Sequence, residues 1–378
     1  MISFFRSFIL PRLPHLAWLI SVPWLVFVAI FRSHRCTSRG PCFNGTSGVI
    51  AIEAGSRGWD SIEFKELYQS AAEYFGCSGV VKLVVRQEVD YLEQIRVVLA
   101  KNRITHYLYD PRTGSQNWSQ AIWQSLKVAT LLTRNNIVPI ILLTDFAVRR
   151  WRVQSAIVSS LRGVVVIFMS PRSVAPIFPH RRLLGPSLMP LSEKMLRQLG
   201  EWIRHRPENL PPKAIFTGSM YEPRTTILAA IEAGVKAKGG VFDCLGRSIG
   251  TARTPDDEYW TRLINADIVF TTSCQMQQPG TDWASIPHFL YRYLEVIASG
   301  TLLIAEDVPA VRRYFTPGEH FVTYESIDDG VDKIIFFLNN HDQRRRIACE
   351  GKRRADFLVH SRTFWMTIDS TLGKDGLF

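Results

Sequence analysis

Short apolar runs alternate with longer amphipathic segments along two stretches of the chain. Runs such as VPIILLT and VVVIFM hold almost no polar residue, which is typical of strands buried on both faces of a parallel sheet. The segments between them repeat apolar residues at helical spacing. The first stretch predicts strands at residues 48–53, 80–85, 105–109, 138–144 and 164–169.

A second alternating series begins at Lys213. It predicts strands at residues 214–217, 241–245, 267–272, 301–305 and 320–324. Helices are expected after these strands, over residues 223–237, 256–265, 286–298, 309–315, 328–339 and 343–359. We therefore predict an α/β protein with two Rossmann-like domains. Ligands bind such sheets outside the carboxyl ends of the strands, so the expected site is a cleft between the two halves.

Five prolines in residues 170–190 interrupt regular structure between the two series. The expected organisation is an N-terminal anchor with its linker at 1–45, a first Rossmann-like domain at 46–190, a linker at 191–212 and a second Rossmann-like domain at 213–378. A helix of about a dozen residues is expected from Ser192, within the second linker.

The segment from Leu16 to Phe31 carries no charged residue, and residues 13–31 together are long enough to span a membrane as a helix, which takes roughly 17–25 residues. Arg32 follows at once with no small-residue cleavage site, which favours an uncleaved anchor over a cleaved signal peptide. The positive-inside rule favours a body on the cytoplasmic face. The glycosylation sequons at Asn44 and Asn117 would matter for a lumenal body.

The charge and the cysteine content limit the classes of partner and site that are expected. The formal net charge is +11, from 45 basic and 34 acidic residues among 378. These basic residues are dispersed and no helix-turn-helix, RNP or zinc-finger motif occurs, so we expect no nucleic-acid partner but an anionic membrane surface or a phosphate-bearing substrate. Six scattered cysteines without a CxxC pair argue against a disulfide scaffold and a structural zinc site, and favour reduced thiols.

The segment YRYLEVIASGTLLIA places Glu295 on a helix that ends at Gly300, directly before a buried strand. Gly300 suits the position after a helix end, where φ is positive. A carboxylate at position 295 can accept hydrogen bonds from two sugar hydroxyls, which is a recurring way to bind a ribose. The alternative is a solvated helix face, but the apolar neighbours of Glu295 favour partial burial.

A glycine turn occurs where the second series begins. In IFTGSMYEPR, Gly218 lets the backbone approach a ligand, and the helix start with Arg224 could hold a diphosphate. An ordinary turn with a surface arginine is the alternative. Ser273 directly follows the predicted strand at 267–272. A small polar side chain at this carboxyl end could bind a base or a phosphate.

These motifs resemble the C-terminal domain of GT-B glycosyltransferases. The likeness lies in RYLE, in ASG with the strand LLIA, in FTPGEHFVTY and in the tail RRIACEG with His360, and it covers roughly residues 213–364. The most similar group is the CgeB/YkvP spore-protein-like glycosyltransferases, related to glycosyltransferase family 4. For the first half, only the architecture is similar.

The resemblance implies a nucleotide-sugar donor bound by the second domain, with Arg292 and Glu295 among the donor-binding residues, and an acceptor bound by the first. Glu295 matches the second glutamate of the family 4 E-x7-E motif, which holds the ribose. Pro287 stands where the first glutamate is expected, which leaves open whether the enzyme retains or inverts the anomeric configuration.

A base is needed if the enzyme inverts, to take the proton of the acceptor hydroxyl. Asp145 and Asp110 follow predicted strands of the first domain and are the candidates, with Glu53 as a third; helix caps or turn residues are the alternative. A D-x-D metal motif is not evident, so the expected transfer uses no metal ion and no cofactor, and arginines and helix dipoles neutralise the departing diphosphate.

We therefore expect a membrane-anchored glycosyltransferase that uses a nucleotide sugar and a glycan or lipid-linked acceptor. Two alternatives remain: a nucleotide-sugar epimerase of the same fold, and a non-catalytic membrane-anchored protein that binds nucleotides or glycans.

Overall fold

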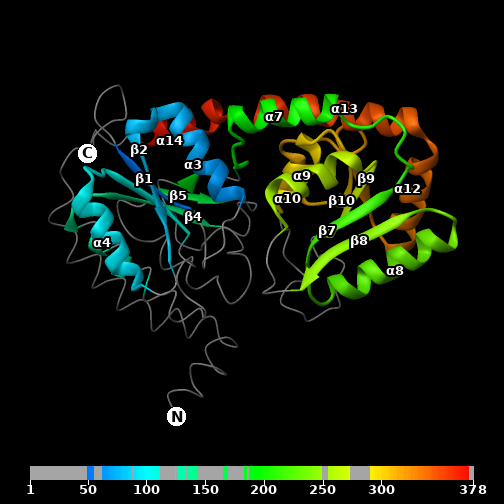
Figure 1. Cartoon of the computed structure of the whole chain (residues 1–378), viewed down its shortest axis with the longest axis horizontal. Coiled ribbons are helices and arrows are strands. Elements are labelled where there is room, and N and C mark those ends of the chain that lie inside the picture. Colours follow the sequence, from blue (N-terminus) through cyan, green and yellow to red (C-terminus); the bar gives the residue numbers. More distant parts are fainter. Residues whose placement is uncertain are drawn as a thin grey trace, which may run out of the picture. The chain divides into compact units, whose positions relative to one another are not determined.

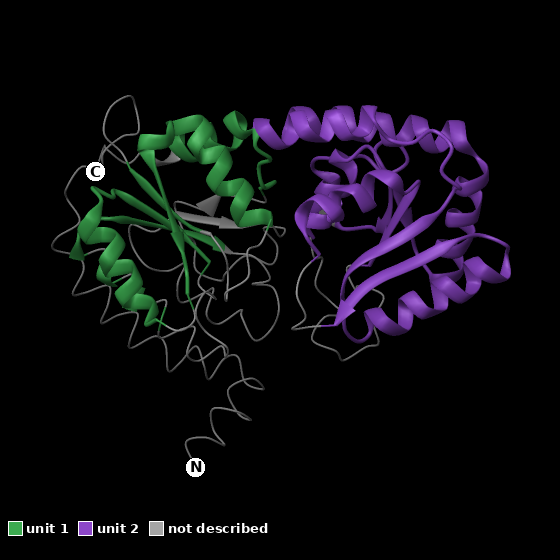
Figure 2. Cartoon of the chain, in the orientation of Figure 1, with its two compact units in different colours: residues 1–192, 361–378 green, residues 193–360 purple. Residues whose placement is uncertain are grey.

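The structure is a computed structural model. Contacts divide the chain into two compact units, of which unit 1 comprises residues 1–192 and 361–378 and unit 2 comprises residues 193–360 (Figure 2). The structure describes residues 49–54, 62–86, 89–110, 124, 127–128, 130–132, 134–143, 165–168, 183–184, 187–248, 254–272 and 290–373.

Unit 1 contains a parallel sheet in the order β2-β1-β3-β4-β5-β6. All five strands predicted from the first apolar series are present, and the two-residue β6 falls in the proline-rich stretch that was expected to be irregular. The strands are β1 (Ile50–Ala54), β2 (Val80–Val84), β3 (His106–Tyr109), β4 (Val138–Leu143), β5 (Val165–Phe168) and β6 (Leu183–Leu184).

In unit 1, helix α3 (Ile62–Phe75) connects β1 to β2, and helix α4 (Tyr91–Lys101) connects β2 to β3 (Figure 1). Asp90 caps α4, because its side chain accepts a hydrogen bond from the Glu93 backbone N–H at 2.9 Å. The C-terminal helix α14 (Ser361–Gly373), which the sequence analysis did not predict, packs against α3 in this unit.

Unit 2 contains a second parallel sheet, in the order β11-β10-β9-β7-β8. The strands are β7 (Ala214–Met220), β8 (Phe242–Ser248), β9 (Ile268–Thr271), β10 (Leu302–Glu306) and β11 (Val322–Tyr324). The five strands of the second apolar series are thus confirmed, and both parallel Rossmann-like sheets agree with the predicted α/β class.

The helices of unit 2 fall where helical spacing predicts them. They are α7 (Glu193–Arg204), α8 (Arg224–Ala237), α9 (Asp256–Asn265), α10 (Tyr291–Ala298), α11 (Pro309–Arg312), α12 (Ile327–Asn339) and α13 (His341–Leu358). Helices α8 and α12 contact each other, and their apolar faces enclose a core over the central strands (Figure 1). Helix α10 packs on β9, β10 and α13. Helix α7 comes from the stretch expected to be a linker, and it belongs to unit 2.

No helix in the described part of the chain is long and apolar enough to cross a membrane. The predicted anchor at residues 13–31 lies outside the described residues.

Candidate functional site

The strand order of unit 2 marks one place on its sheet as a ligand site. Strand β7 lies between β8 and β9, so the connections after β7 and β9 leave in opposite directions along the sheet. At such a switch point the connecting loops diverge and open a crevice at the carboxyl ends of the strands. Gly218 lies near this place, but within β7 and paired with Gly246 of β8 rather than in the turn that was predicted there, because the strand continues to Met220.

Arg224 ties the two sides of this switch point together. It is buried at the start of α8; its Nη1 donates to the Ser219 carbonyl at 3.0 Å and its Nη2 to the Thr272 carbonyl at 3.1 Å. Its guanidinium also lies 4.4 Å from the centroid of the Tyr221 ring. The structure therefore gives Arg224 a positioning role, because two of its nitrogens hold the exits of β7 and β9.

Arg292 lies against Gly218. A Cβ atom on Gly218 would come within 2.3 Å of Arg292 Nη1, and the φ of Gly218 is +149°, so a side chain there would displace the guanidinium. The Arg292 guanidinium lies 5.7 Å from the centroid of the Phe216 ring and 5.9 Å from that of Tyr259. The structure thus brings together Gly218 and Arg292, two residues 74 positions apart that the sequence analysis chose separately.

Glu295 lies one turn further along α10, and only 5% of it is exposed. Its Oε2 accepts a hydrogen bond from the Tyr259 hydroxyl at 2.7 Å. Burial raises the pKa of Tyr259 well above its ordinary value, Arg292 opposes this shift and Glu295 reinforces it. Tyr259 therefore remains a hydrogen-bond donor at neutral pH and orients the carboxylate. Glu295 is thus buried more completely than the partial burial that the sequence predicted.

Gly300 has the conformational role that the sequence predicts. It follows the end of α10 with a φ of +71°, and its N–H donates to the Ile297 carbonyl at 3.1 Å. It therefore sets the direction in which the chain enters β10.

Glu306 is a buried carboxylate of this region that the sequence analysis missed. At the end of β10 its Oε1 accepts hydrogen bonds from the Thr272 hydroxyl at 2.6 Å and the Tyr324 hydroxyl at 3.2 Å. Burial, reinforced by Glu306, raises the pKa of Tyr324 well above its ordinary value. The sequence signal for Glu306 was its position directly after the apolar run TLLIA. A charged residue there lies at the carboxyl end of β10, where the neighbouring parallel strands β9 and β11 also end.

The candidate bases of unit 1 have different surroundings. Glu53 is completely buried at the end of β1, and the Tyr91 hydroxyl and, at 2.8 Å, the Tyr107 hydroxyl both donate to its Oε1. Asp110 follows β3 and is 1% exposed. Both lie at carboxyl ends of neighbouring strands, as predicted. Asp145 and, in unit 2, Ser273 lie outside the described residues.

The part of the chain that the structure describes holds no group of three or more His, Cys, Asp or Glu side chains that could bind a metal ion.

One known protein family matches residues in the second half of the chain. Residues 225–363, which include Arg292 and Glu295, match the family described as glycosyl transferase-like. No curated protein sequence matches this chain significantly.

Solved structures share the fold of both units. Sucrose-phosphate synthase from Thermosynechococcus elongatus has a TM-score of 0.55 at 15% identity, over 87% of this chain and 98% of that one. HepE from Anabaena, in complex with UDP and glucose, has a TM-score of 0.54 at 13% identity, over 86% of this chain and all (100%) of that one.

A glycosyltransferase from Rickettsia africae has a TM-score of 0.51 at 11% identity, over 87% of this chain and 100% of that one. At these identities the likeness shows the fold. Residues 225–363 therefore match a glycosyl transferase-like domain, within a chain that shares the two Rossmann-like units of the GT-B fold.

Proposed function

We propose that the protein transfers a sugar from a nucleotide-sugar donor to a glycan or lipid-linked acceptor. The observation that carries this proposal is the pair of Arg292 and Glu295 on one short helix, with the guanidinium against Gly218 at the switch point of the sheet. A cation and an oriented carboxylate one turn apart match a diphosphate and a ribose, the two parts that all nucleotide sugars share.

The proposed roles follow from these positions. Glu295 accepts hydrogen bonds from the ribose hydroxyls, and Tyr259 holds its carboxylate in place. Arg292 faces the diphosphate, whose negative charge grows as the sugar leaves, so that transfer proceeds without a metal ion. The base that takes the acceptor proton is Asp145 or Asp110. Uridine is the first base to test, because HepE, a protein of similar fold, was solved with UDP-glucose.

The finer assignment within the proposal is the CgeB/YkvP spore-protein-like group. Its support is the motif combination around Glu295, Gly300 and the segment FTPGEHFVTY. We also propose that residues 13–31 anchor the protein in a membrane with its body on the cytoplasmic face. The charge-free segment from Leu16 to Phe31 and the flanking arginines support this placement.

The test is nucleotide binding by calorimetry with the full chain and its Glu295→Gln variant. UDP, GDP, ADP and CDP are titrated first, followed by the sugar conjugates of the nucleotide that binds. Glutamine keeps the side-chain volume and an acceptor for Tyr259, but it removes the charge and one of the two oxygens for the ribose. The expected result is binding of one nucleotide, weakened at least about tenfold by the substitution.

Glu232→Gln is the matched control, because Glu232 is exposed on α8 and lies outside the site. Its affinity should equal that of the wild type. A folded Glu295→Gln protein with unchanged affinity would refute the ribose assignment. Release of free nucleotide from the bound sugar conjugate, measured over time, separates a transferase from a protein that only binds.

A further inference from the structure

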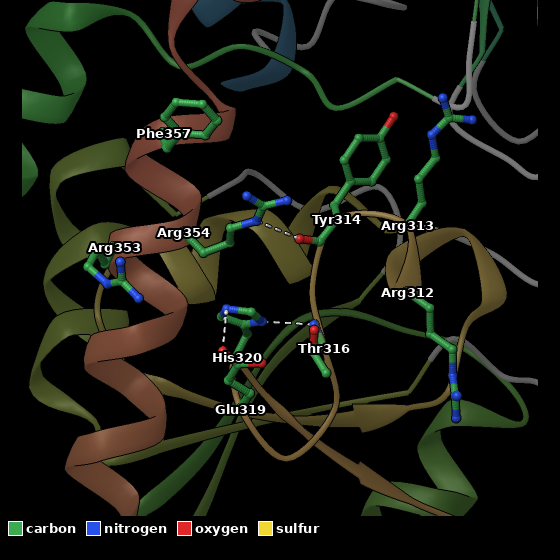
Figure 3. Close-up of a pocket in the computed structure, with 9 residues that line it drawn as sticks. All are labelled: Arg312, Arg313, Tyr314, Thr316, Glu319, His320, Arg353, Arg354 and Phe357. Atoms are coloured by element: carbon green, nitrogen blue, oxygen red, sulfur yellow. Dashed lines mark hydrogen bonds and ion pairs between the residues drawn. The ribbon is translucent and has the colours of Figure 1, made fainter.

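A second concave site lies in unit 2, between the loop that follows α11 and the last turns of α13 (Figure 3). Its volume is about 680 Å³, and it shares no lining residue with the site around Glu295. Four arginines line it, against one carboxylate, that of Glu319. The remaining described lining residues carry no fixed charge, so the cavity is strongly positive.

Two of these arginines have carboxylate partners. Arg312 binds Asp307 through Nε at 2.7 Å and 2.9 Å, and Arg353 Nε donates to Glu350 at 3.0 Å. Their charges are therefore largely compensated.

The other two arginines both contact Tyr314. Arg354 Nε donates to the Tyr314 carbonyl at 3.0 Å, and the Arg313 guanidinium lies 6.0 Å from the centroid of the Tyr314 ring. Among the described residues, neither guanidinium forms an ion pair. Arg313 and Arg354 thus bring two positive charges without an ion pair among the described residues to one hollow, which favours the binding of an anion there.

His320 adds an oriented donor to this hollow. Its side chain is 9% exposed, and its Nδ1 accepts a hydrogen bond from the Thr316 backbone N–H at 2.8 Å. Burial lowers the pKa of His320; Glu319 opposes this shift and Arg354 reinforces it, so the ring is neutral at pH 7. A neutral ring that accepts at Nδ1 carries its proton on Nε2.

His320 lines the cavity, and Figure 3 shows its second ring nitrogen, Nε2, on the side of Glu319. The closest carboxylate oxygen, of Glu319, lies 3.8 Å from Nε2, beyond hydrogen-bond distance. Figure 3 shows the His320 ring and the Arg354 guanidinium on two sides of the hollow, with Phe357 further along α13. Phe357 is 72% exposed.

We propose that this cavity, the Arg313–Arg354–His320 pocket, binds a phosphate-bearing ligand. Arg354 and the Nε2–H of His320 hold the phosphate oxygens, Arg313 adds charge at the mouth, and Phe357 contacts an apolar part beside the phosphate. Guanidinium groups fit phosphate oxygens with paired hydrogen bonds, and a phosphate dianion balances the charges of two arginines. A soluble phosphate ester and a lipid phosphate headgroup both present this chemistry.

The experiment measures binding by the full chain in two arms. One arm titrates inorganic phosphate by calorimetry with UDP present in excess. The other measures sedimentation with vesicles of phosphatidylcholine, with and without phosphatidic acid. The tested variant is Arg313→Gln/Arg354→Gln. The matched control is Arg345→Gln/Arg346→Gln, which removes two exposed charges from the same helix outside the pocket.

We expect phosphate or phosphatidic acid to bind, and the pocket variant to weaken that binding at least about tenfold while the control does not. The arm that responds identifies the source of the phosphate. Equal weakening by both double variants, or no binding in either arm, would overturn the proposal. If the pocket variant melts below the wild type, Arg313→Gln alone replaces it, since that side chain is exposed and the bond from Arg354 to Tyr314 remains.

This proposal does not depend on the glycosyltransferase assignment. The phosphate experiment changes Arg313 and Arg354, whereas the nucleotide experiment changes Glu295. Either proposal can therefore be refuted while the other stands.

Discussion

Single residues of the candidate site are held by contacts between segments far apart in the chain. Arg292 occupies the space that a side chain at position 218 would need, and Tyr259 fixes the Glu295 carboxylate. The missing side chain of Gly218 is therefore part of the site. The glycine is required for two reasons, the close guanidinium and a φ that other residues rarely adopt.

Gly218→Ala should remove nucleotide binding and destabilise unit 2. We compare it with Gly239→Ala, where φ is +76° but no atom lies within 4 Å of the added Cβ. The control should cost ~1–2 kcal/mol of unfolding free energy from backbone strain. Gly218→Ala should cost a similar amount of unfolding free energy, because the end of the flexible Arg292 side chain can move, but only Gly218→Ala should remove nucleotide binding. Urea unfolding and calorimetry measure the two properties, and an unchanged nucleotide affinity of Gly218→Ala would contradict the role of this close approach.

At the scale of elements, helix α13 contains three consecutive arginines, of which one is buried and two are exposed to solvent. Arg344, Arg345 and Arg346 follow one another in the sequence. The structure buries Arg344 and leaves the other two exposed. Arg344 donates to Asp267 at 2.9 Å and to two carbonyls at the end of α12, so it joins α13, α12 and the start of β9.

Asp267→Asn should weaken this junction. Arg206 and Arg344 both bind the Asp267 carboxylate, and removal of its charge leaves a buried guanidinium uncompensated, at a cost of ~3–5 kcal/mol. Asp243→Asn is the control, because Asp243 pairs with Lys213 at the surface and should contribute less than ~1 kcal/mol. Thermal and urea unfolding measure the difference. Similar losses in the two variants would show that the junction contributes little.

At the scale of the whole molecule, the chain returns to its first unit. After unit 2 ends at residue 360, α14 packs on α3 in unit 1, where the Trp365 indole N–H donates to the Ser70 hydroxyl at 3.0 Å. The rings of Trp365 and Phe75 are 5.4 Å apart. Unit 1 therefore includes α14, whose packing on α3 contributes to its stability.

Membrane association is a property of the whole chain that can be tested directly. The full chain should remain with membranes after carbonate extraction, and a chain without residues 13–31 should be released. Protease added from the cytoplasmic face should digest the body. Protection from that face, together with glycosylation at Asn44 or Asn117, would place the body on the other side.

The sequence by itself predicts the strands, the class and the two Rossmann-like sheets, because buried parallel strands require continuous apolar runs that local patterning shows. It also predicts the role of Gly300, since a helix end with positive φ is a local property. Glu295 and Arg292 are found through motifs that lie within one helix.

Only the tertiary structure decides which of these residues meet. The contact of Gly218 with Arg292, the hydrogen bond from Tyr259 to Glu295 and the attachment of Arg224 to the Thr272 carbonyl all join separate strands and helices. Burial of Arg344 but not Arg345 depends in the same way on what packs against one side of α13. Such contacts depend on how the elements pack, which local sequence patterns do not show. The candidate residues could therefore be chosen from the sequence, but their contacts with one another could not be predicted from it.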